Sequence, residues 1–113
     1  MDGIPSVVFT VPPLASVGLL ERDARDRGLA FRVNHENTSS WYSSHRVAER
    51  YSGFKTLIDE QTGRIFGAHL LGPDAAETIN LFALAIRKGL TSADLKDVIY
   101  SYPTVASDVP YMI

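Results

Sequence analysis

Three histidines, His35, His45 and His69, are the side chains best suited to bind a metal or to carry a proton near neutral pH. Metal motifs bring such ligands together through short spacings, such as i and i+4 on one helix face. No two of these histidines have such a spacing, and the sequence contains no cysteine to complete a zinc site. The pattern therefore predicts ordinary strand or surface histidines and no metal site.

Serine is abundant, but it stands in none of the sequence settings that turn it into a nucleophile. The G-x-S-x-G elbow is missing, and so are the two glycine patterns that cradle phosphate, G-x-G-x-x-G and the P-loop sequence. Without cysteine, the chain also lacks a disulfide, an iron–sulfur cluster and a thiolate nucleophile. Redox chemistry would need groups supplied from elsewhere.

The composition is that of one globular domain. The chain has 113 residues, 45% of them hydrophobic and 21% charged, which is enough to bury one core and excludes a multi-domain enzyme. Its formal net charge of -2 provides no cationic field for nucleic acid. We find no signal peptide and no run of about 18 apolar residues, so we expect a cytoplasmic protein without membrane contact.

An aromatic, serine-rich segment from residue 37 to residue 52 shows neither a helical nor a strand period, and it predicts a long loop. Trp41 and Tyr42 are good anchors for recognition, since loops on a rigid scaffold commonly bind ligands or partners. The Trp41 ring would equally well cover an apolar edge of the sheet. Both interpretations stay open.

The strongest helix signals lie between Gly72 and Gly89. Proline opens the segment, acidic residues stand near its start, basic residues near its end, and glycine follows: Pro73, Asp74, Glu77, Arg87, Lys88 and Gly89. One apolar stripe consists of Ile79, Phe82, Ala83 and Ile86, and further apolar residues are Ala75, Leu81, Leu84 and Ala85. A helix that is apolar on more than one side must be covered by its own sheet and by a second surface.

Shorter elements surround this helix. Residues 6–10 and 29–35 predict strands, and residues 54–59 and 64–71 predict a hairpin whose turn ends at Gly63. In the second strand, Leu29, Phe31 and Val33 are expected on one face, and Ala30, Arg32 and Asn34 on a face exposed to solvent. The alternation therefore predicts a strand with one solvent-exposed face.

Three short helical segments complete the predicted elements. Residues 21–27 predict a surface helix with i,i+4 ion pairs such as Glu21 with Arg25, ending before Gly28. Thr91 and Asp94 form a capping box for the next helix, with Leu95, Val98 and Ile99 facing inward. Residues 105–112 predict one or two further turns.

Four motifs in chain order resemble a known family. They are the segments 9–19 (FTVPPLASVGL), 53–58 (GFKTLI), 62–72 (TGRIFGAHLLG) and 102–104 (YPT). Together they resemble the C-terminal dimerisation domain of the pyridine nucleotide-disulfide oxidoreductases, flavoenzymes that include glutathione reductase, dihydrolipoamide dehydrogenase and mercuric reductase. The resemblance extends from about Ile4 to about Asp108 and therefore covers nearly the whole chain.

This resemblance implies an α+β fold, an antiparallel β-sheet with helices packed on it, that forms a homodimer. The second cover of the apolar helix is then the partner subunit, with Ile79, Phe82, Ala83 and Ile86 at the interface. In the family, domains for FAD and NAD(P)H precede this one, and a redox-active cysteine pair lies in the FAD domain. None of these parts is in this chain, so it is expected to hold no cofactor itself.

The closing motif of the family departs from its pattern here. The family has a histidine, held by a glutamate, that exchanges a proton with the cysteine pair of the other subunit; here Tyr102 stands at the histidine position and Ser107 at the glutamate position, with Asp108 next. A phenol with a pKa of about 10 is a poor base but a good hydrogen-bond donor. We therefore expect Tyr102 to donate a hydrogen bond, Asp108 to orient it, and Pro103 and Thr104 to lie near FAD.

Two hypotheses follow from the sequence. In the first, residues 1–113 are a single dimerisation domain, a fragment of a longer FAD- and NAD(P)H-dependent enzyme of redox homeostasis, with residues 1–3 an added start. In the second, the chain is a stand-alone protein-interaction module with the same fold and no catalysis. The sequence before Ile4 in the natural protein discriminates between them, because the enzyme requires an FAD fingerprint and a cysteine pair there.

Overall fold

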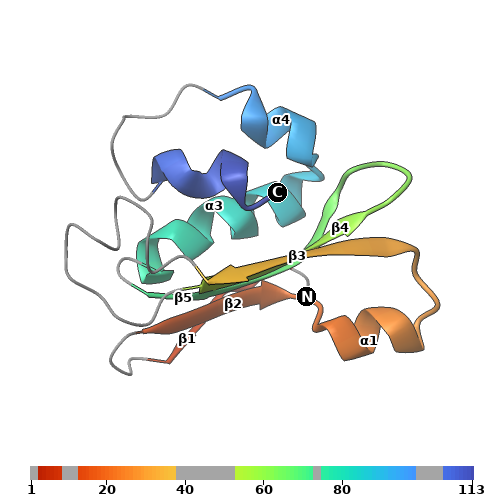
Figure 1. Cartoon of the computed structure of the whole chain (residues 1–113), viewed down its shortest axis with the longest axis horizontal. Helices are drawn as coiled ribbons and strands as arrows, with labels where there is room; N and C mark the ends of the chain where they lie inside the picture. Colours follow the sequence, from red (N-terminus) through yellow and green to blue (C-terminus); the bar gives the residue numbers. More distant parts are fainter. Residues whose placement is uncertain (1–2, 9–12, 38–52, 73–74, 99–105) are drawn as a thin grey trace.

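The computed structural model describes residues 3–8, 13–37, 53–72, 75–98 and 106–113 (Figure 1). Residues 38–52 of the predicted loop, which include Trp41, Tyr42 and His45, lie outside the described residues. The same holds for Tyr102, Pro103 and Thr104.

Five antiparallel strands form one sheet in the order β1-β2-β5-β4-β3. The strands are β1 (Ser6–Val8), β2 (Leu14–Gly18), β3 (Phe31–Asn37), β4 (Gly53–Asp59) and β5 (Ile65–Leu71). The helices are α1 (Glu21–Asp26), α3 (Ala75–Lys88), α4 (Ser92–Lys96) and the 3-10 helix η1 (Ala106–Tyr111). The predicted α+β class with an antiparallel sheet is confirmed.

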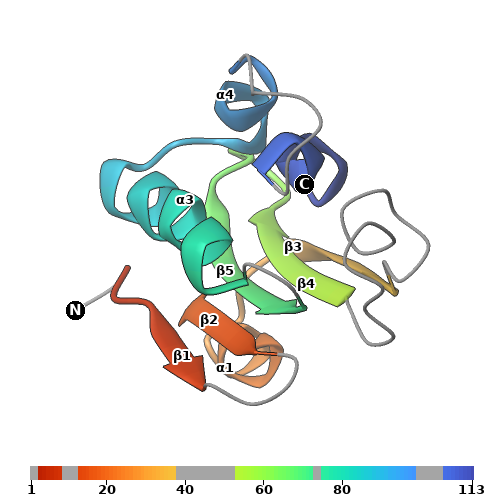
Figure 2. The ribbon, with the colours of Figure 1, turned by 90° about the vertical axis from the view of Figure 1, so that its left-hand side faces the viewer.

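The helices lie on both faces of the sheet. Figures 1 and 2 show α3, α4 and η1 on one face and α1 on the opposite face. We call the first the α3 face and the second the α1 face. On the α3 face, α3 lies over β2 and β5, while η1 lies over β4 and β3 (Figure 2). The C-terminal segment therefore packs next to α3 in the same layer.

Strand β2 was not predicted from the sequence, although it lies inside the sheet between β1 and β5. Ala15 and Val17 point to the α3 face and are buried, while Leu14 is partly exposed on the other. The alternation is present in the sequence, but it is short and follows Pro12 and Pro13, which read as a break. These residues form a strand because they pair with β1 on one side and with β5 on the other.

The β4–β5 hairpin is formed as predicted. Both Asp59 carboxylate oxygens accept hydrogen bonds inside the turn, one from the backbone N–H of Gln61 at 2.9 Å and one from the Thr62 hydroxyl at 2.8 Å. These bonds hold the pKa of the Asp59 carboxyl below its ordinary value. Gly63 closes the turn with a φ of 77°, a conformation that favours glycine.

The core lies between α3 and the sheet. Its largest fully buried side chains include Phe82 and Ile79 from α3, Ile58 from β4, and Val109 from η1. Burial of aliphatic and aromatic side chains of this size contributes about 1.5–3 kcal/mol each. The C-terminal segment thus belongs to the same core as α3.

Strand β3 follows the prediction only in part. Arg32 is exposed and Phe31 half-buried as expected, but Arg32 and Asn34 also donate hydrogen bonds to backbone oxygens of residues 113 and 112. Val33, expected on the buried face, is 37% exposed. The prediction used polarity alone, and a polar face can be covered when backbone carbonyls satisfy its donors.

Helix α4 begins at its predicted capping box, but one of the residues expected to face inward is exposed. Thr91 accepts from the N–H of Asp94 and Asp94 accepts from the N–H of Thr91, so the predicted capping box is present. Helix α4 ends at Lys96, and Leu95 is buried. Val98, expected to face inward, lies beyond the helix and is 50% exposed. Ile99 lies outside the described residues.

Candidate functional site

The sequence predicted the dimer interface on helix α3, but the predicted residues lie on the side of the helix that faces the core of its own chain. Ile79 and Phe82 are fully buried against the sheet of their own chain, Ala83 is nearly so, and Ile86 is half-buried. These four side chains therefore stabilise the domain itself, and a second copy of the chain cannot cover Ile79 or Phe82 without opening the core. A single chain does not test the predicted interface, and Ile86, half-buried like Leu81, still offers part of its side chain to a partner.

The outward side of α3 carries a different stripe. Glu77, Leu81, Leu84 and Lys88 follow spacings of four, three and four residues, which places them along one line of the helix. Leu84 is 51% exposed, Leu81 is half-buried, and the two charged ends are exposed. We call this set the outer stripe. Its spacing was visible in the sequence, but only burial shows which of two apolar sides faces outward.

The C-terminal segment was predicted to carry the residues closest to chemistry. Tyr102, Pro103 and Thr104 lie outside the described residues, and for Asp108 the structure describes the backbone within η1 and not the side chain. The structure therefore does not test whether Tyr102 and Asp108 come together. It does show how the segment that follows Tyr102 is attached to the sheet.

Three donors on the α3 face hold this segment. The Thr56 hydroxyl donates to the Met112 carbonyl at 2.6 Å, and the Asn34 amide donates to the same carbonyl at 3.3 Å. The Arg32 guanidinium donates to the Ile113 carbonyl at 2.9 Å. Arg32 and Asn34 also line an open groove of about 530 Å³ beside Tyr111. Sequence analysis missed these contacts, because they join residues more than fifty positions apart.

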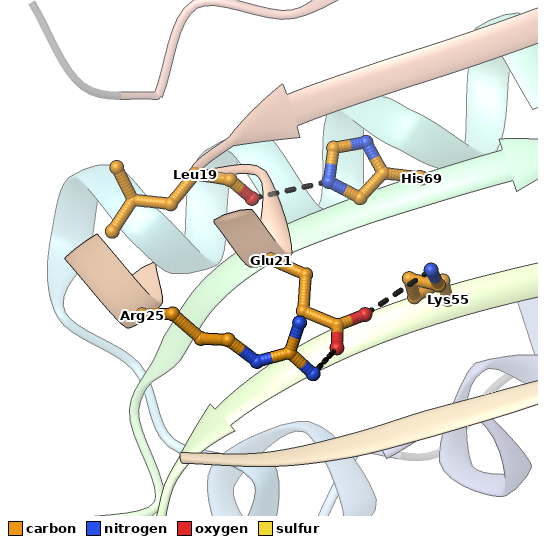
Figure 3. Close-up of polar contacts among 5 residues, drawn as sticks. All are labelled: Leu19, Glu21, Arg25, Lys55 and His69. Carbon is orange, nitrogen blue, oxygen red and sulfur yellow. Dashed lines mark hydrogen bonds and ion pairs between the residues drawn. The ribbon is translucent and has the colours of Figure 1, made fainter. Parts of the chain in front are cut away.

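The α1 face carries a charged cluster at the start of α1 (Figure 3). Glu21 forms ion pairs with Arg25, as predicted, and with Lys55 of β4 at 3.2 Å. The hydrogen bond from Lys55, followed by the charge of Arg25, holds the pKa of the Glu21 carboxyl below its ordinary value. These side chains fasten α1 to the sheet, and Leu20 at the N-cap makes no capping hydrogen bond with its side chain.

His69 acts in this attachment as a hydrogen-bond donor. Its Nε2–H donates to the Leu19 carbonyl at 3.1 Å, just before α1 (Figure 3). The Leu19 carbonyl also lies where a side chain on Gly67 would be, 2.2 Å from an added Cβ, so the chain crosses β5 here because residue 67 is glycine. Within the described residues, no group of histidine, aspartate and glutamate side chains is arranged to hold a metal ion.

Among the described helices, none is long and apolar enough to cross a membrane. The longest of them, α3, has 14 residues.

Comparison with known sequences identifies relatives over nearly the whole chain. Residues 4–113 match the family described as the pyridine nucleotide-disulphide oxidoreductase dimerisation domain. The chain is 47% identical over 110 residues to an "uncharacterized 19.7 kDa protein in mercuric resistance operon" of Staphylococcus aureus, covering 97% of this chain and 61% of that protein. It is 32% identical over 103 residues to mitochondrial dihydrolipoyl dehydrogenase of Mus musculus, covering 91% of this chain and 20% of that enzyme.

Solved structures show the same fold. The HOCl-induced flavoprotein disulfide reductase RclA from Escherichia coli matches with a TM-score of 0.93 at 28% identity, covering 99% of this chain and 26% of that one. LpdA from Mycobacterium tuberculosis matches with a TM-score of 0.90 at 22% identity, over 98% of this chain and 24% of that one. The chain thus spans about three fifths of the staphylococcal protein and 20% to 26% of the other proteins.

Proposed function

The chain belongs to the dimerisation-domain family of the pyridine nucleotide-disulphide oxidoreductases, and from this premise we propose that it joins two copies of a flavoenzyme subunit through the outer face of α3. In this proposal FAD and NAD(P)H bind to other domains of the same polypeptide, and the whole protein is a cytoplasmic oxidoreductase. The residues of this chain contribute the contact between subunits and one edge of the partner's active site.

The self-complementary outer stripe is the observation that carries this proposal. When two α3 helices pack antiparallel about a two-fold axis near residues 82 and 83, Leu81 meets Leu84 of the partner subunit. The same arrangement brings Glu77 close to Lys88 of the partner subunit. The outer stripe, exposed at Glu77, Leu84 and Lys88 and half-buried at Leu81, therefore supplies both an apolar centre and opposite charges at its ends, as a two-fold interface between identical subunits requires.

A charged residue in the middle of the outer stripe tests the interface. Leu84→Glu places two carboxylates next to apolar groups at the two-fold contact, and we expect the dimer to dissociate at least about tenfold more readily. Val98→Glu is the matched control, because Val98 is exposed to nearly the same extent, 50% against 51%, and lies outside α3. Molar mass by light scattering, with circular dichroism to verify folding, reads out the result.

Charge reversal then tests the orientation of the two helices. Glu77→Lys should weaken the dimer, and the pair Glu77→Lys with Lys88→Glu should restore it. A Leu84→Glu chain that remains dimeric, or a reversed pair that is no better than the single variant, contradicts the proposed interface.

In a longer enzyme, the segment after α4 would extend the role of this domain to catalysis. There Tyr102 donates a hydrogen bond to a thiolate, a substrate or the flavin of the partner subunit, Asp108 orients it, and Pro103 and Thr104 lie near FAD. The phenol is suited to this because it donates a hydrogen bond without needing to act as a base. Tyr102→Phe should slow reduction of the disulfide or other acceptor more than reduction of the flavin by the nicotinamide, and equal effects on both half-reactions contradict the role.

The staphylococcal relative favours a second candidate function, a stand-alone interaction module. That protein has a mass of 19.7 kDa, and this chain covers 61% of it. The remaining two fifths are too short for two nucleotide-binding domains of about 100–150 residues each. Intact mass and visible absorption of the native protein, isolated with an antibody against this domain, separate the two functions: a yellow protein several times 12.4 kDa supports the enzyme, and a colourless one of similar size supports the module.

A further inference from the structure

Specific hydrogen bonds attach the C-terminal segment to the α3 face of the sheet. Asn34 and Thr56 lie directly opposite each other on β3 and β4, and both donate to the single carbonyl of Met112. Arg32, two residues before Asn34, donates to the backbone oxygen of the next residue, Ile113. Two neighbouring carbonyls of one segment thus bind a line of donors from two strands.

Thr56 is unusual in its surroundings. It is fully buried, and the residues that pair with it along the sheet on the other side, Ala68 and then Val17, are apolar core residues. Burial of a hydroxyl lowers stability unless the hydroxyl is hydrogen-bonded, so a valine here would give the more stable protein if only packing mattered. The 2.6 Å bond to the Met112 carbonyl satisfies the hydroxyl.

Apolar packing alone defines the position of this segment poorly. Val109, Met112 and Ile113 are buried, but contacts of this kind are non-directional and tolerate a shift of the segment along the sheet. Hydrogen bonds to two specified carbonyls do not tolerate such a shift, because their distance and angle requirements are narrow.

We propose that Thr56, Asn34 and Arg32 are positioning residues that fix the register of residues 106–113 on the sheet. They thereby hold the backbone of the segment that follows the Tyr102–Thr104 motif of the sequence in one position on the sheet. The catalytic part of this inference rests on the proposed function, because it assumes that the motif serves the active site of a partner subunit. The register itself rests on the contacts of this chain alone.

The central test compares Thr56→Val with Thr56→Ser in the whole chain. Valine keeps the shape and the strand preference of threonine and removes the donor, whereas serine keeps the donor. We expect amide exchange of Met112, whose N–H bonds to the Val109 carbonyl, to become roughly tenfold faster in Thr56→Val. In Thr56→Ser it should stay within about twofold of the original rate.

A spectroscopic signature separates loss of the bond from general loosening. The carbonyl ¹³C shift of Met112 should move upfield in Thr56→Val and return in Thr56→Ser, while the carbonyl shifts of α1 stay unchanged. Asn34→Ala removes the second donor to the same carbonyl and provides an independent variant if Thr56→Val folds poorly. Equal exchange rates and equal Met112 shifts in the original chain, in Thr56→Val and in Asn34→Ala overturn the proposal.

A failure of the proposed function has a different outcome. In a longer flavoenzyme that carries this domain, Thr56→Val should slow the same half-reaction as Tyr102→Phe, and Thr56→Ser should restore it. If Tyr102→Phe itself has no effect on that half-reaction while Thr56→Val still releases residues 106–113, the register assignment is supported and its catalytic role is refuted.

Discussion

The two faces of the sheet hold their attached segments by different physical means. On the α3 face, the C-terminal segment is fixed by buried apolar side chains and by donors from Thr56, Asn34 and Arg32 to backbone carbonyls. On the α1 face, α1 is fixed by the buried Ala24, by a partly exposed carboxylate, Glu21, between Lys55 and Arg25, and by His69. In the first attachment the hydrogen bond of Thr56 is buried and those of Asn34 and Arg32 are partly buried, whereas the ion pairs of Glu21 in the second respond to salt and protons.

This difference indicates which segment can bear function. Position is most accurate where packed side chains and directed hydrogen bonds act together, since supporting contacts of this kind lock the geometry of a site. The segment that follows the predicted catalytic motif has three buried apolar side chains and three directed hydrogen bonds, whereas α1 has one buried side chain, that of Ala24, beside the polar contacts of Glu21 and His69. The comparison therefore predicts that disturbing the C-terminal attachment costs more than disturbing α1.

Removal of a buried side chain should reveal the difference between the two attachments most strongly. Met112 is nearly fully buried, and Met112→Ala should lower the free energy of unfolding by about 2–3 kcal/mol through lost burial and a residual cavity. Leu20→Ala, at the start of α1 where the side chain is 44% exposed, should cost less than about 0.5 kcal/mol. Urea unfolding measures both, and similar costs for the two variants contradict the comparison.

Acid should affect the α1 attachment selectively. Because the folded pKa of Glu21 lies below its ordinary value of 4.5, the unfolded chain takes up this proton first as the pH falls. The stabilisation from Glu21 is therefore complete above pH 4.5 and is lost as the pH falls through the lower, folded pKa. Thr56 and Asn34 do not titrate in this range.

Glu21→Gln should accordingly remove one part of the acid destabilisation seen in urea unfolding below pH 4.5. Glu60→Gln, at an exposed residue of the hairpin turn, is the control. Asp59, whose pKa is also lowered, contributes equally to all three proteins. An unchanged pH profile for Glu21→Gln shows that Glu21 does not hold α1 to the sheet.

Salt should produce the smallest effect and sharpen the same contrast. At 1 M the screening length is about 3 Å, so the pairs of Glu21 with Lys55 and Arg25 weaken. Amide exchange at Ala24, which bonds to the Leu20 carbonyl, should become about twofold faster. Exchange at Met112 should not change, and equal acceleration at both amides argues against two kinds of attachment.

Much of the fold could be predicted because its signals are local. Pro73 and Gly89 bracket α3, the turn ending at Gly63 defines the hairpin, and Thr91 with Asp94 defines the start of α4. Strand β2 lacked such a signal, since five residues with weak alternation become a strand only through pairing with β1 and β5. This strand could be predicted only with knowledge of its two neighbours in the sheet.

The candidate site was less predictable, for a reason that α3 illustrates. The sequence shows two apolar sides on this helix, and the larger one, with Ile79 and Phe82, was assigned to the interface. The structure uses that side for its own core and leaves Leu84 outside. The attachment of Met112 by Thr56 and Asn34 was invisible for another reason, because nothing local specifies a contact across so many residues.

The most direct test of the central claim is the molar mass of the chain in solution, measured by sedimentation equilibrium over a wide concentration range. A dimerisation domain with a self-complementary outer stripe should have twice the mass of 12.4 kDa, and Leu84→Glu should return it to 12.4 kDa. A folded chain that stays at 12.4 kDa at every concentration would contradict the claim that this domain forms the dimer through α3.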